Sequence, residues 1–137
     1  MDAKVFNGEI EFKDVWFRYP TRREQWVFKG LNLKINPNDI IAIVGESGQG
    51  KSTFINLVMR FYDPEFGTVL IDGVDVTTMN VVQLRERLGL VMQEPMLFNY
   101  SLAENILYGK LNASNQEIYD AAKIANALEF IETKELS

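Results

Sequence analysis

A glycine-rich segment at residues 45–53 carries the residue types best suited to chemistry in this chain. It reads Gly-Glu-Ser-Gly-Gln-Gly-Lys-Ser-Thr, and the spacing G-x-x-x-x-G-K-S is typical of a loop that binds nucleotide phosphates. Its glycines allow backbone angles and close approaches that a Cβ atom would prevent. Backbone N–H groups then converge on phosphate oxygens, and the positive end of the following helix dipole adds to the attraction.

Each part of this segment has an expected role in holding a magnesium nucleotide. Lys51 would carry charge to the β- and γ-phosphates, and the Ser52 hydroxyl would ligate Mg²⁺. Thr53 would donate to the α-phosphate, although a threonine at a helix start is often only a cap. We therefore predict ATP and Mg²⁺ as cofactors, Lys51 as a catalytic residue as well, and nucleotide binding by Gly45, Glu46, Ser47, Gly48, Gln49, Gly50, Lys51, Ser52 and Thr53.

The elements on either side of the loop agree with this interpretation. Residues 40–44, Ile-Ile-Ala-Ile-Val, predict a buried parallel strand that enters the loop. A helix is expected over about 51–61, ended by Asp63-Pro64, because core residues recur at helical spacing: Phe54, Leu57, Val58 and Phe61. A chance turn rich in glycine and serine is the alternative, and the complete strand–loop–helix order counts against it.

The rest of the chain predicts an α/β layout that becomes helical after about residue 100. Alternating and branched residues predict strands over 9–19, 26–35, 67–71 and 88–92. Asp72-Gly73 predicts a tight turn. Capping residues predict helix starts at Asn80, Ser101 and Ser114.

Composition restricts the function further. The chain has 137 residues, 47% of them hydrophobic, which is enough for one domain with a core. A net charge of −5 argues against a nucleic-acid partner or an anionic membrane surface. The absence of cysteine excludes disulfides and thiolate metal sites. No apolar run approaches the ~20 residues of a membrane-spanning helix, so we expect a soluble chain as given.

Further motifs cover most of residues 8–110. They are Gly8–Phe12, Phe17–Pro20, the phosphate loop, Arg60–Pro64, Gly67, Ile71–Gly73, Val91–Phe98, Ser101, Glu104–Ile106 and Tyr108-Gly109. Together these motifs resemble the nucleotide-binding domain of ATP-binding cassette (ABC) transporters, most closely exporters of the multidrug-resistance and peptide-transporter type. The resemblance implies a P-loop NTPase (RecA-like) core with N-terminal antiparallel strands over residues 1–93. It also implies the start of an α-helical subdomain over residues 94–137, in a truncated domain.

The same resemblance adds two site residues. Tyr19 resembles the aromatic residue that stacks on adenine, and a stack of this kind is worth roughly 1–3 kcal/mol. Gln93 resembles the Q-loop glutamine that contacts Mg²⁺ and the attacking water, which would make it a metal ligand and a catalytic residue. Taken alone, Tyr19 would be an aromatic on a strand surface and Gln93 a solvent-facing amide.

Other polar and apolar residues give weaker indications of function. Asp72 and Asp75 fit hairpin turn chemistry better than a catalytic carboxylate pair, and Arg85, Glu86 and Arg87 fit a solvated helix face. Asn38 stands where the family usually has glycine, and asparagine tolerates the left-handed region. The apolar run 96–98 is either a docking surface for a membrane domain or simple subdomain packing.

The chain has no counterpart of three parts of the family's domain, which are the glycine-rich signature segment, the second acidic strand and the switch histidine. The switch histidine is excluded because the sequence contains no histidine. We therefore expect ATP-Mg binding without turnover, in a chain whose parent would couple ATP hydrolysis to transmembrane transport. Implied partners are the transmembrane domain of an exporter and a second nucleotide-binding domain, at the cytoplasmic face of a membrane. The alternatives are a short non-catalytic or regulatory nucleotide-binding module and, least supported, an unrelated phosphate-loop enzyme, because no N-K-x-D guanine motif is present.

Overall fold

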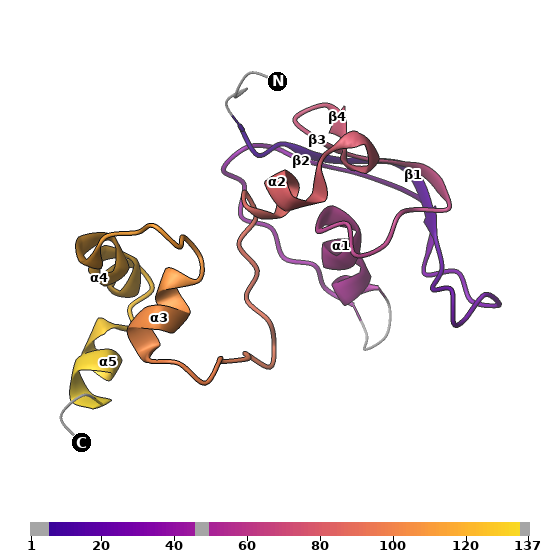
Figure 1. Ribbon diagram of the computed structural model, residues 1–137. Coiled ribbons are helices and arrows are strands. Elements are labelled where there is room, and N and C mark those ends of the chain that lie inside the picture. Colours follow the sequence, from indigo (N-terminus) through magenta and orange to yellow (C-terminus); the bar gives the residue numbers. More distant parts are fainter. Residues whose placement is uncertain (1–5, 46–49, 135–137) are drawn as a thin grey trace. The chain divides into compact units, whose positions relative to one another are not determined.

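The computed structural model describes residues 6–45 and 50–134, and the chain forms two compact units, residues 1–90 and 91–137 (Figure 1). The first unit contains all the described strands. The second, coloured orange to yellow in Figure 1, contains helices joined by short loops. The predicted change from an α/β layout to a helical one is therefore confirmed.

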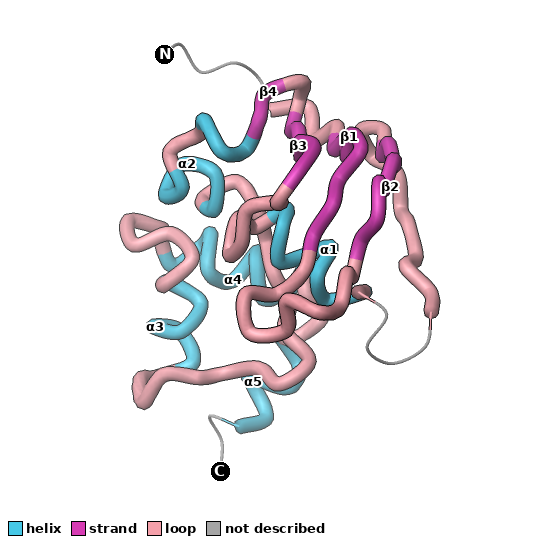
Figure 2. Tube along the Cα trace, turned by 90° about the vertical axis from the view of Figure 1, so that its right-hand side faces the viewer, coloured by secondary structure: helices cyan, strands magenta, loops and turns pink. Residues whose placement is uncertain are grey.

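An antiparallel sheet forms one side of the first unit, in the order β2-β1-β3-β4 (Figure 2). Its strands are β1 (Ile10–Phe17), β2 (Phe28–Ile35), β3 (Phe66–Ile71) and β4 (Val74–Asp75). A bulge shifts the register of β1 between Phe12 and Val15, with Asp14 in the left-handed region at φ 47°. Because of this shift, Phe12, Val15 and Phe17 are all buried, although strict alternation would place Phe12 and Val15 on opposite faces.

Helix α1 (Lys51–Val58) packs against the buried face of this sheet. The Phe54 ring stacks on Phe12 with centroids 4.5 Å apart, and Leu57 has no exposed surface. The helix ends earlier than the predicted residue 61, because Arg60 adopts φ 52° and the Phe61 N–H donates to the Asn56 carbonyl. Phe61 was predicted to lie in the core, and this is wrong: the reversal at Arg60 takes it off the helix face and leaves it 47% exposed.

The β3–β4 connection confirms the predicted turn. Asp72 and Gly73 have φ values of 50° and 76°, as a two-residue hairpin turn requires. The Asp72 carboxylate accepts the backbone N–H groups of residues 7–9, and Asp75 caps the short 3₁₀ helix η1 (Val76–Thr78) by accepting from the Thr77 N–H. Both carboxylates have structural partners, in agreement with the turn interpretation.

Three of the remaining helices begin at the caps that the sequence indicated. Asn80 caps α2 (Val81–Arg85) through its side-chain oxygen. In the second unit, α3 (Leu102–Leu107) and α4 (Asn115–Ile124) start with complete capping boxes at Ser101 with Glu104 and at Ser114 with Glu117. The last helix is α5 (Leu128–Lys134). Asn38 lies in the left-handed region at φ 65°, as its residue type allows.

Two of the strand predictions are wrong. Residues 40–44 and 88–92 form no strand, and Ile40, Val44 and Val91 are 102%, 88% and 95% exposed. A parallel strand depends on neighbours on both sides, and within the described residues neither segment joins the sheet. The α/β class is confirmed, with an antiparallel sheet and helices, while the parallel part of a RecA-like core is not formed in this part of the chain.

Candidate nucleotide-binding site

Gly50 closes the predicted phosphate loop and leads directly into α1. Its φ of 94° is in the left-handed region, and an added Cβ atom would lie 2.8 Å from Val27 Cγ1 and 2.9 Å from Phe28 Cε1. Backbone conformation and space therefore both require glycine here. Four residues of the predicted loop, Glu46, Ser47, Gly48 and Gln49, lie outside the described residues.

The start of α1 differs from the starts of α3 and α4. Gly50 at the N-cap has no side chain to accept an N–H, and the first turn, Lys51-Ser52-Thr53, contains no acidic residue. In contrast, α3 and α4 each have a serine cap and a glutamate in the first turn. No carboxylate of α1 itself therefore accepts the first N–H groups of the helix or neutralises its positive dipole end. A helix start of this kind is suited to binding an anion.

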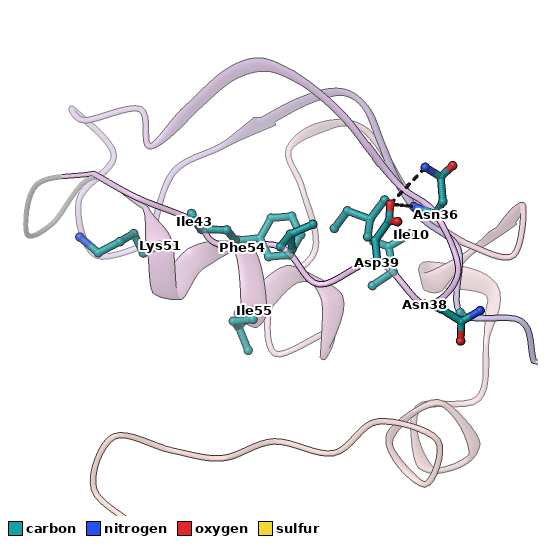
Figure 3. A pocket seen from close by; sticks show the side chains of 11 residues that line it. Ile10, Asn36, Asn38, Asp39, Ile43, Lys51, Phe54 and Ile55 are labelled. Carbon is teal, nitrogen blue, oxygen red and sulfur yellow. Dashed lines mark hydrogen bonds between the residues drawn. The ribbon is translucent and has the colours of Figure 1, made fainter.

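The Lys51 side chain contacts the first residue of the predicted loop. Its Nζ donates to the Gly45 carbonyl over 2.6 Å, so the described residues on both sides of the loop are linked. A cavity of about 460 Å³ lies beside Lys51, between α1 and residues 36–43. Figure 3 shows Lys51 at one end of it and Asn36, Asn38 and Asp39 at the other. Its wall is more apolar than polar, with Ile10, Ile41 and Phe54 among the lining residues, so it suits apolar side chains better than a triphosphate.

Tyr19 and Thr53 are brought together although they are far apart in the sequence. The Tyr19 hydroxyl lies 2.8 Å from Thr53 Oγ1, and the Asn56 amide donates to the same hydroxyl over 3.0 Å. Thr53 is only 3% exposed. The hydroxyl group of the predicted adenine-stacking residue is therefore fixed to the first turns of α1. Sequence reasoning missed Asn56, whose only signal was its position three residues after Thr53 on the same helix face.

The Tyr19 ring belongs to an aromatic cluster. Phe17 and Tyr62 approach it edge to face, with centroid distances of 5.0 and 5.2 Å. Tyr19 and Tyr62 both line a second cavity of about 350 Å³, whose other lining residues are Phe17, Arg18, Pro20, Arg23, Asp63 and Glu65. Sequence reasoning also missed Tyr62, which it used only as part of the resemblance.

An ion pair stabilises the rim of this second cavity. Arg18 donates to both carboxylate oxygens of Glu65 over 2.8 Å and to the Arg23 carbonyl over 2.7 Å. Its guanidinium also stacks over the Trp26 ring, 4.3 Å from the centroid. The Arg18 hydrogen bond lowers the pKa of Glu65 from its ordinary value, and the same bond raises the pKa of Arg18. The end of β1 is thus joined to the segment that enters β3.

Arg85 is exposed on α2, as predicted, and it also has a structural role. Its guanidinium donates to the carbonyls of Met59 and Arg60 over 3.0 and 2.9 Å and stacks over the Phe61 ring. The prediction did not include these bonds, which form because α1 ends with carbonyl groups that need donors and Arg85 lies within reach of them. Arg85 therefore caps the C-terminus of the helix whose N-terminus forms the site.

The second unit holds the remaining predicted residues. Gln93 lies exposed in a bend there, and its metal and catalytic roles stay predictions. In the same unit, Met96 and Leu97 are 82% and 72% exposed, and the Phe98 ring lies 4.8 Å from that of Tyr108.

Two further observations concern the parts of the chain that the structure describes. No group of three or more aspartate or glutamate residues gathers there in a way that could hold a metal ion. No helix among the described residues is long and apolar enough to cross a membrane.

Comparisons with known proteins agree on one family. The family described as "ABC transporter" matches residues 28–137. "ABC transporter B family member 13" of Arabidopsis thaliana is 56% identical over 90% of this chain and 10% of its own length. "ATP-binding cassette sub-family B member 10, mitochondrial" of Mus musculus is 48% identical over 96% of this chain and 19% of its own length.

A solved structure supports the same match. The structure of a bacterial Atm1-family ABC exporter with ATP bound is 41% identical and has a TM-score of 0.86, over 95% of this chain and 23% of that one. The chain thus spans only a small part of the proteins to which it is similar.

Proposed function

Because this chain belongs to the ABC transporter family, we propose that it is the ATP-binding portion of an exporter's nucleotide-binding domain. The observation that carries the proposal is the start of α1. There, Gly50 has a left-handed φ at a position where a side chain would be strained and crowded, the N-terminus of α1 has no side-chain cap, and Lys51 Nζ bonds the Gly45 carbonyl. An anion-binding helix start next to a fixed tyrosine suits a phosphate chain that ends in an aromatic base.

The residues at this site fit ATP with Mg²⁺. Lys51 would pair with the β- and γ-phosphates, and Ser52, exposed at the first turn of α1, would ligate the metal. For Gln93, in the second unit, the resemblance implies a role as a metal ligand. Thr53 would contact the α-phosphate, and Tyr19 would stack on the adenine. A bound Mg²⁺ would neutralise phosphate charge. Hydroxyl and amide ligands of this kind agree with the lack of a carboxylate cluster among the described residues.

The parent protein, in this proposal, couples ATP hydrolysis to transport across a membrane. The chain would then lie at the cytoplasmic face, against a transmembrane domain and a second nucleotide-binding domain. Met96 and Leu97 support a docking surface for the membrane domain, because both are apolar and mostly exposed in the second unit.

The 137-residue chain itself should bind ATP-Mg without turning it over. No acidic strand of the expected kind follows Gln93, and the sequence contains no histidine to orient the reaction. Loss of a general base costs about 10²–10⁴ in rate. The same feature supports the alternative of a non-catalytic nucleotide-binding or regulatory module. Phosphate release at an ordinary enzymatic rate would contradict both.

Replacement of Lys51 tests the binding proposal. Lys51→Ala should weaken ATP-Mg binding at least about tenfold, since a hydrogen bond to a charged group is worth roughly 1.5–3 kcal/mol. Isothermal titration calorimetry of the purified chain measures this. Lys29→Ala is the matched control, because Lys29 is an exposed lysine on β2 of the same unit. Equal affinity of Lys51→Ala and the unsubstituted chain would contradict the phosphate-loop assignment.

A further inference from the structure

We propose that Asn56 and Tyr62 are positioning residues for nucleobase recognition. Asn56 holds the hydroxyl of Tyr19 and Tyr62 holds its ring, so that the base of the nucleotide binds in the 350 Å³ cavity that both tyrosines line. This inference rests on the proposed function, because it assumes that Tyr19 contacts the base. It adds two residues to which the resemblance assigned no role.

The first step concerns the direction of the hydrogen bonds at Tyr19. The Asn56 amide nitrogen can only donate, so the Tyr19 oxygen accepts from it over 3.0 Å. The single hydroxyl proton of Tyr19 is then available to Thr53 Oγ1 at 2.8 Å. Asn56 and Thr53, the residue expected at the α-phosphate, are therefore joined through the Tyr19 hydroxyl, and either hydroxyl can be the donor between Tyr19 and Thr53. The base-stacking residue and the phosphate-binding helix are linked by this chain of hydrogen bonds.

The second step concerns the ring. Tyr62 meets Tyr19 at an interplanar angle of 89°, and Phe17 meets it at 81°. Such edge-to-face contacts fix the plane of an aromatic ring. Tyr62 reaches this position because α1 ends at Val58 and the chain reverses at Arg60, with φ 52°. The ring orientation of Tyr19 thus depends on where the helix stops.

The third step concerns the space that this arrangement leaves open. Tyr62 is 39% exposed and Tyr19 is only partly buried, so neither behaves as an ordinary core aromatic. Both face a cavity whose volume of about 350 Å³ falls in the range of small-molecule sites, roughly 300–1,000 Å³. A rigid aromatic wall beside an open cavity is the arrangement that favours stacking of a flat ligand, because the ordering of the side chains precedes binding.

The test compares two ligands that share the triphosphate and differ in the base. Affinities for Mg-ATP and for magnesium tripolyphosphate are measured by calorimetry on the whole chain and on the variants Asn56→Leu, Tyr62→Ala and Tyr62→Phe. Gln83→Leu on α2 and Tyr119→Ala on α4, where Tyr119 is 44% exposed, serve as matched surface controls. Near-ultraviolet circular dichroism reports whether each variant is folded, and Tyr62→Leu replaces Tyr62→Ala if the latter does not fold.

We expect Asn56→Leu and Tyr62→Ala to weaken ATP binding about threefold to tenfold, the effect of one neutral hydrogen bond or one aromatic pair. Tripolyphosphate binding should stay within about twofold of the unsubstituted chain, and Tyr62→Phe should bind both ligands normally. Unchanged ATP affinity in both variants, or equal losses for the two ligands, would overturn the inference. Equal binding of ATP and tripolyphosphate by the unsubstituted chain would also overturn it and leave the phosphate loop intact. Binding of neither ligand would overturn the proposed function, and this inference with it.

Discussion

Two glycines show how the lack of a Cβ atom decides local structure in this chain. Gly67 and Gly73 have nearly the same φ, 79° and 76°. A Cβ atom on Gly73 would meet nothing within 4 Å, whereas one on Gly67 would lie 2.1 Å from the Asp14 carbonyl oxygen. Gly67 faces the bulge of β1, so the bulge and the glycine require each other. Comparison of Gly73 with Gly67 therefore separates the cost of backbone strain from the cost of a steric clash.

Alanine at these two positions should therefore have unequal effects. Gly73→Ala should lower the free energy of unfolding by about 1–2 kcal/mol, the cost of a left-handed conformation for a residue with a side chain. Gly67→Ala should lower it by more than about 4 kcal/mol or prevent folding, because the clash is with backbone and not with a flexible side chain. Urea denaturation followed by circular dichroism measures both. Similar losses at the two sites would show that β1 can move away from β3 at little cost.

The local backbone features at this scale followed from residue types. The left-handed glycine at position 50, the cap at Asn80 and the turn at Asp72-Gly73 are features of this kind, and sequence reasoning identified them. Asn56, Tyr62 and Arg85 were not identified, because their roles depend on contacts with distant segments. Arg85, for example, bonds carbonyls 25 and 26 positions earlier.

At the scale of elements, α3 and α4 of the second unit each begin with a capping box. In α4, the Glu117 carboxylate accepts the Ser114 N–H over 2.8 Å and pairs with Lys110. The Lys110 hydrogen bond, followed by those of the Ser114 backbone and hydroxyl, lowers the pKa of Glu117 from 4.5 to about 2. The folded carboxyl thus has the lower pKa. Its contribution to stability is complete above the unfolded value of 4.5 and is lost as pH falls through about 2.

The start of α4 should therefore fray on acidification over this range. Cα chemical shifts of residues 115–124 should move toward unfolded values as pH falls from about 5 to about 2. Glu117→Gln should remove most of that movement, because glutamine can still accept the Ser114 N–H but does not titrate. The box at Ser101 and Glu104 in α3, where the pKa of Glu104 is also lowered by Ser101, provides an internal control. A variant that frays as much as the unsubstituted chain would assign the pH dependence to another group.

The elements also show where sequence reasoning was less successful. Antiparallel strands and capped helices were predicted well, because the contacts that form them lie within the chain. The segments 40–44 and 88–92 have the composition of buried parallel strands, yet they are irregular and partly or fully exposed. Composition reports the environment that a segment is suited to, and pairing depends on partners that the described residues do not provide.

At the scale of the whole molecule, this mismatch indicates what residues 40–44 are adapted to contact. Ile40 and Val44 are almost fully exposed, while Ile41 and Ile43 line the apolar cavity beside α1. A short run of branched residues without pairing partners is typical of a segment that self-associates. The match to the ATP-bound exporter structure covers 95% of this chain but only 23% of that one, so most of the relative lies outside the match.

Lysine substitution in this segment should therefore have opposite effects in two settings. In the 137-residue chain, Ile40→Lys and Val44→Lys should change the free energy of unfolding by less than about 0.5 kcal/mol relative to the unsubstituted chain, because both sites are exposed. Both substitutions should also reduce light scattering at high protein concentration, because they reduce self-association. Leu57→Lys, at a fully buried position, should unfold the chain and provides the control. In a longer polypeptide that completes the sheet, the same two changes should be strongly destabilising, since they would bury an unpaired charge. If instead Ile40→Lys unfolds the 137-residue chain, the segment is packed in solution against residues of the chain itself, and its strand-like composition is already satisfied there.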